Sequence, residues 1–140
     1  MCPFVKRVVA IIGILAILAG AGYLVKVYTT WRVNARTAKF NADVDNFFAG
    51  LQQYKENVGN YPTGSNSEII KMLQGANPKK LIILVSRKAE LNDKGEILDP
   101  WGTPLRIYFS DAAVLVRSAG PNRRFDDSTV IEADDYFRSN

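Results

Sequence analysis

Apolar residues fill the start of the chain without a break. Residues 8–25 read VVAIIGILAILAGAGYLV and contain no charged side chain. As a helix, these residues would extend about 27 Å, close to the roughly 30 Å thickness of the hydrocarbon core of a bilayer. Tyr23, Tyr28 and Trp31 follow at the far end, where amphipathic rings favour the membrane interface. The pattern therefore predicts a transmembrane helix over residues 8–25.

A cleaved signal peptide is the alternative interpretation of the same segment. Lys6 and Arg7 form a short basic region before it, and Ala19-Gly20-Ala21 offers a small-residue cleavage site. Cleavage there would give a secreted protein without the apolar helix. The apolar run is long for a signal peptide, however, and residues 25–54 contain no proline and only one glycine. We therefore favour an uncleaved anchor, with residues 1–7 as a short cytoplasmic tail.

Beyond the anchor, the apolar residues recur with the period of a helix. Between residues 40 and 54 they fall at i, i+4, i+7, i+8, i+11 and i+14, which places them on one face. These residues are Phe40, Val44, Phe47, Phe48, Leu51 and Tyr54. The pattern predicts that residues 26–58 continue the same helix and turn this face toward a core. Gly59 is expected to end the helix as its C′ residue.

In the second half of the chain, short segments alternate with turn residues. The sequence predicts a short helix from Ser65 to Gly75, capped by Ser65 or Ser67. Two strands, Leu105–Phe109 and Val114–Arg117, are expected to form a hairpin. The remainder, residues 118–140, looks like an acidic loop. The expected fold class is α+β, with a long N-terminal helix packed on a small antiparallel sheet and residues 59–140 as the globular head.

Composition and charge narrow the function further. The chain has no histidine and a single cysteine, Cys2, which excludes serine–histidine and cysteine–histidine nucleophiles and any internal disulfide. Lys+Arg total 18 against 14 Asp+Glu, but this small excess is not concentrated in a basic stripe. We therefore expect a protein that is not an enzyme and that has neither a small-molecule substrate nor a nucleic-acid partner. Trp101, between Pro100 and Pro104, is interpreted as a structural wedge.

The acidic loop contains the one candidate metal site. The proposed ligands, all with side-chain oxygen, are Asn122, Asp126, Asp127, Asp134 and Asp135. Loops rich in oxygen ligands bind Ca²⁺, which takes six to eight of them. The alternative is a solvated acidic loop whose charge is balanced by Arg123, Arg124 and Arg138. Both interpretations remain open from the sequence.

Three motifs resemble those of a known family. They are LQQYK at residues 51–55 with GNYPTG at 59–64, LDPWGTP at 98–104, and SAGPN at 118–122 with Asp134-Asp135 later. In this order, after an N-terminal apolar helix, they resemble the major, G-type pseudopilin of type II secretion, a branch of the pilin-like family. The resemblance covers most of the chain.

This resemblance implies a pilin-like fold and a role in a filament. Such subunits stack their N-terminal helices into a short periplasmic pseudopilus that helps to push folded proteins through an outer-membrane pore. The implied partners are the lipid bilayer, further copies of the chain through the N-terminal helix, and other subunits of the secretion machine. The implied location is the bacterial inner membrane, with one span and a periplasmic C-terminal domain.

The resemblance also implies a structural calcium in the C-terminal loop. Asn122 stands where the family often has aspartate, and Asp134 and Asp135 match its closing acidic pair. Asp126 and Asp127 lie in the variable middle of that loop.

The leader departs from the family pattern. Precursors of this family have a glycine before the processing site, then phenylalanine or methionine, and a glutamate as the fifth mature residue. Here Gly13 is followed by Ile14, and no acidic residue occurs between Met1 and Phe40. A second function therefore stays open: a membrane-tethered, non-catalytic binding or accessory module whose pilin-like head is neither processed nor polymerised.

Overall fold

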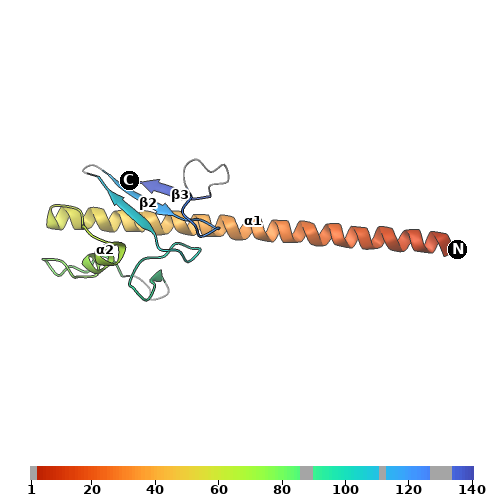
Figure 1. Cartoon of the computed structure of the whole chain (residues 1–140), viewed down its shortest axis with the longest axis horizontal. Coiled ribbons are helices and arrows are strands. Elements are labelled where there is room, and N and C mark those ends of the chain that lie inside the picture. Colours follow the sequence, from red (N-terminus) through yellow and green to blue (C-terminus); the bar gives the residue numbers. More distant parts are fainter. Residues whose placement is uncertain (1–2, 86–89, 111–112, 127–133) are drawn as a thin grey trace. The chain divides into compact units, whose positions relative to one another are not determined.

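The described residues form two helices and a small sheet (Figure 1). The computed structural model describes residues 3–85, 90–110, 113–126 and 134–140. The elements are α1 (Pro3–Val58), α2 (Asn66–Leu73), β1 (Arg106–Phe109), β2 (Val114–Ser118) and β3 (Tyr136–Ser139). The chain divides into two compact units, Met1–Ala35 and Arg36–Asn140. One long N-terminal apolar helix and a small antiparallel sheet are thus present, as the α+β expectation required.

Helix α1 is the one helix of the described chain that is long and apolar enough to cross a membrane. None of its most apolar window is buried inside the protein. The helix ends at Val58, and the N–H of Gly59 donates to the carbonyl of Lys55 at 2.7 Å. Gly59 has a φ of +105°, which suits glycine because it lacks a Cβ. The predicted end of the helix is confirmed.

Helix α2 begins with the predicted serine cap. The Ser65 hydroxyl accepts a hydrogen bond from the Glu68 N–H at 3.4 Å, and the Glu68 carboxylate accepts one from the Ser65 N–H at 2.7 Å. This reciprocal pair satisfies donors that have no partner within the helix. Two hydrogen bonds lower the pKa of the Glu68 carboxyl. The larger effect comes from the backbone N–H of Ser65, and the next from its hydroxyl.

The sheet has three antiparallel strands in the order β1-β2-β3. The expected hairpin is confirmed, with Arg106 opposite Arg117 and Phe109 opposite Val114. The expectation that residues 118–140 lack regular structure is wrong for β3, which pairs with β2 and places Tyr136 opposite Ser118. Four residues are too few to show an alternation in the sequence, and the strand forms because β2 offers a free edge.

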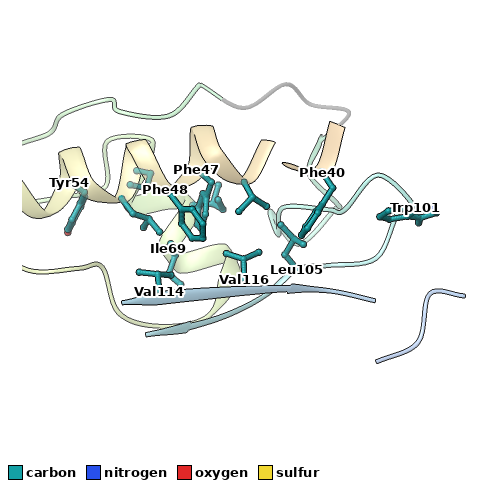
Figure 2. Packing of buried hydrophobic residues seen from close by; sticks show 13 residues of the cluster. Phe40, Phe47, Phe48, Tyr54, Ile69, Trp101, Leu105, Val114 and Val116 are labelled. Atoms are coloured by element: carbon teal, nitrogen blue, oxygen red, sulfur yellow. The ribbon is translucent and has the colours of Figure 1, made fainter. Parts of the chain in front are cut away.

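The core lies between the second part of α1, α2 and the sheet. All six residues of the predicted apolar face, from Phe40 to Tyr54, are buried. Figure 2 shows Val114 and Val116 of β2 pointing toward this face, with Leu105 beside them. Because β2 alternates between buried and half-exposed residues, its inner side chains meet the helix. The predicted packing of helix on sheet is confirmed.

The corner at residues 98–104 is fixed by a buried carboxylate. One oxygen of Asp99 accepts from the N–H groups of Trp101 at 3.0 Å and Thr103 at 2.8 Å. Its other oxygen accepts from the Ser118 hydroxyl at 2.7 Å. Trp101 is buried and stacks on Tyr136, with ring centroids 5.1 Å apart. The interpretation of Trp101 as a structural wedge is therefore confirmed.

Candidate metal site

The predicted ligands lie at the two ends of the connection between β2 and β3. Asn122 and Asp126 follow β2, and Asp134 and Asp135 come directly before β3. Because β2 and β3 are antiparallel neighbours, the end of one strand lies beside the start of the other. Four of the five predicted residues are therefore brought together. Asp127, the fifth, lies outside the described residues.

The three described aspartates form a tight cluster. One carboxylate oxygen from each of Asp126, Asp134 and Asp135 lies within 4.8 Å of the other two. Asn122 donates to this cluster from its backbone N–H, to Asp134 at 3.1 Å, and from its side-chain amide, to Asp126 at 2.7 Å. Its amide oxygen accepts from the Arg124 N–H at 2.7 Å. Asn122 thus acts on the carboxylates as a hydrogen-bond donor rather than as an oxygen ligand.

Gly120 allows the two ends of the connection to approach closely. Its φ is +65°, and a Cβ at this position would collide with the backbone carbonyl of Asp134. Its N–H donates to the Ser118 hydroxyl at 3.1 Å, and that hydroxyl donates in turn to Asp99. The corner at residues 98–104 and the acidic cluster are therefore joined by a continuous set of contacts.

Arg117 belongs to this cluster, and the sequence did not predict its part in it. It donates from Nε to the carboxylate of Asp135 and from Nη2 to the backbone carbonyl of Asp126. The side chains of Arg117 and Asp135 are 17% and 2% exposed, so this ion pair is largely removed from water. The Asp126 N–H donates to the other oxygen of Asp135 at 3.4 Å. Both oxygens of Asp135 are therefore already hydrogen-bonded.

The positive charge beside the acidic cluster comes from a different arginine than the sequence analysis expected. Arg138 was one of three arginines expected to balance the loop, but it pairs with Asp45 of α1. Arg117 supplies the cation instead. The alternation of β2 could have indicated that the Arg117 side chain points away from the core. It could not have identified Asp135 as the partner, because that contact depends on the pairing of β3 with β2.

The residues present fit a metal ion only in part. The Oδ1 atom of Asp134 is buried and has no hydrogen-bond partner among the described residues, so a cation there would satisfy it. Asp135, however, is committed to Arg117, and one oxygen of Asp126 accepts from Asn122. The described side chains thus leave Asp134 and Asp126 as ligands, against the six to eight oxygens that Ca²⁺ takes. The expectation of calcium stays a prediction.

No protein-family model, no curated protein and no solved structure matches this chain. The class that the structure itself defines is an α+β protein with a long N-terminal helix, part of which is apolar enough to span a membrane.

Proposed function

We propose that the chain is a non-catalytic structural subunit of a machine resembling type II secretion or the type IV pilus, supporting protein export by forming a filament. In this proposal the apolar part of α1 is stored in the bacterial inner membrane and the head lies in the periplasm. The observation that carries the proposal is that the uncharged run at residues 8–25 and the core-facing stripe belong to one helix without a break.

The exposed apolar side chains of α1 support a role that requires lipid or neighbouring helices. Ile11, Ile14, Ile17 and Leu18 are all more than half exposed in the isolated chain. A contiguous apolar surface of this kind is not stable in water and needs a covering. A bilayer covers it while the subunit is stored, and the same surface is then available for packing against other copies.

The motifs that carry the family resemblance have physical roles in the head. Gly59 ends α1, Asp99 fixes the corner of the second motif, and Gly120 permits the close approach in the third. Each role restricts the residue type at its position. Their occurrence in family order supports the assignment to a pilin-like subunit more strongly than any one of them alone.

A second function is favoured by the composition of the leader. The first acidic residue of the chain is Asp43, and Gly13 is followed by Ile14. A carboxylate within the apolar helix is what would set the register between neighbouring subunits of such a filament. Without it, the same fold can serve as a membrane-tethered, non-catalytic binding or accessory module.

The decisive experiment examines the full chain in its own cell. A deletion strain is complemented with the wild type or with a control in which a cleavable signal sequence replaces residues 1–25. Export, the presence of the protein in a sheared filament preparation and the intact mass of the protein are then measured. Restored export by the wild type alone, together with a shortened mass in the filament fraction, supports the assembly subunit.

Other outcomes identify the competing functions. A full-length mass confined to membranes, with export unaffected by the deletion, would refute the assembly subunit and favour the tethered module. A mass lacking everything through about Ala21 would show a secreted protein and refute both membrane proposals.

A further inference from the structure

The structure contains a cation of its own at the acidic cluster. We propose that the guanidinium of Arg117 is the built-in counter-ion that holds Asp126, after β2, beside Asp135, before β3, so that this contact does not depend on calcium. The inference concerns the stability of the head and stands independently of the proposed filament role.

Arg117 joins the two ends of the connection through one rigid group. Its Nε contacts Asp135, next to the start of β3, and its Nη2 contacts the backbone carbonyl of Asp126, on the side that follows β2. A guanidinium is planar and its donors point in fixed directions, so one side chain holds both acceptors in a defined geometry. A divalent cation would also hold the two ends together, by coordinating oxygen atoms of the same kind.

Aromatic rings hold the guanidinium in place. Its central carbon lies 5.4 Å from the ring centroid of Phe125 and 5.1 Å from that of Phe137, which is its partner residue on β3. Contacts between a cation and the face of a ring are favourable, and they restrict the side chain before it meets Asp135. Arg117 is therefore preorganised for the ion pair.

The neighbouring strand gives a second reason why Arg117 needs Asp135. Arg106 lies directly opposite Arg117 in the β1–β2 register, and like charges opposite each other are destabilising. Arg106 sits over the ring of Phe125 at 3.9 Å and has no carboxylate partner among the described residues. If a metal ion took Asp135, Arg117 would be left beside Arg106 without a counter-charge.

The oxygen atoms left for a metal ion form a weaker site than the ion pair of Arg117 and Asp135. With Asp135 committed, the described side chains offer the unpartnered oxygen of Asp134 and one oxygen of Asp126. Asn122 presents hydrogen-bond donors toward both carboxylates. Two carboxylates that already accept hydrogen bonds from N–H groups fall well short of the six to eight oxygen ligands that Ca²⁺ takes.

The test is the thermal unfolding of the full-length protein in detergent micelles, in EDTA and in millimolar calcium chloride. Near-UV circular dichroism follows the unfolding of the head because Trp101 is stacked on Tyr136. A structural site filled at a hundred times its Kd would raise the midpoint temperature, Tm, by roughly 10 °C. We expect the Tm of the wild type to agree within about 1 °C between the two buffers. A rise of several degrees in calcium, lost in Asp134→Asn, would overturn the proposal.

Two arginine variants test the ion pair directly. Arg117→Ala leaves a buried, unpaired Asp135 and should lower Tm by roughly 10 °C in both buffers. Arg106→Ala, on the opposite strand, should lower Tm by no more than about 3 °C. A loss for Arg117→Ala no larger than that of Arg106→Ala would also overturn the proposal. If Arg117→Ala does not fold, the calcium response of the wild type decides alone.

Discussion

Replacing Asp99 by alanine should destabilise the head more than any single change in a surface loop. Asp99 is 5% exposed, and its carboxylate accepts hydrogen bonds from the backbone of Trp101 and Thr103 and from the hydroxyl of Ser118. Hydrogen bonds to charged groups contribute roughly 1.5–3 kcal/mol each, and neighbouring losses do not add fully. We therefore expect the free energy of unfolding to fall by about 4 kcal/mol, with a decrease in Tm of roughly 15 °C.

The assay is thermal or urea unfolding of the full-length protein in detergent, with two further variants for comparison. Ser118→Ala removes one of the three bonds and should cost about 1–2 kcal/mol. When Asp99→Ala and Ser118→Ala are combined, the loss of unfolding free energy should be smaller than the sum of the two single losses. The reason is that the two residues share one hydrogen bond. Asp93→Ala, an exposed aspartate of the preceding turn, should change stability by less than about 0.5 kcal/mol. If Asp99→Ala costs no more than Asp93→Ala, the role assigned to the buried carboxylate is wrong.

Three further predictions use the same unfolding assay. Leu51→Ala, at a fully buried position of the core, should cost about 2–5 kcal/mol; a cost under about 1 kcal/mol would contradict the packing. Gly120→Ala should cost roughly 2–3 kcal/mol because its Cβ would collide with a carbonyl, whereas Gly95→Ala, also at positive φ but with open space, should cost about 1 kcal/mol. Equal losses would contradict that difference. The lowered pKa of Glu68 contributes stability above its ordinary value of 4.5 that is lost as pH falls through the lowered pKa. Glu68→Gln should weaken this acid sensitivity, and an unchanged pH dependence would contradict the capping box.

Local patterns in the sequence were sufficient for the helices and the hairpin. The apolar face around Phe47 repeats over four turns, so the helix and its buried side follow from one periodicity. Gly59 and Ser65 mark a helix end and a helix start through backbone requirements that act within a few residues. Such signals are readable because the residues that satisfy one another are close in sequence.

The rest of the site could not be predicted because it depends on contacts far apart in the chain. Strand β3 has only four residues, and what makes it a strand is the free edge of β2. Unless β3 is known, nothing in the local sequence places Asp135 beside Arg117, which is 18 residues away. One missed strand therefore led to one missed ion pair. The local sequence shows the acidic residues as a group, but it does not show which arginine neutralises part of their charge.

A series of contacts in the head links the second motif to the third. Asp99 orients the hydroxyl of Ser118, Ser118 accepts the N–H of Gly120, and Gly120 admits the carbonyl of Asp134. Each step is a short-range contact, yet together they link a corner before the sheet to a loop after β2. The Ser118 hydroxyl donates its one hydrogen to Asp99, and its oxygen still has lone pairs to accept from the Gly120 N–H. An alanine of similar size can make neither bond, which is why a serine suits the end of β2.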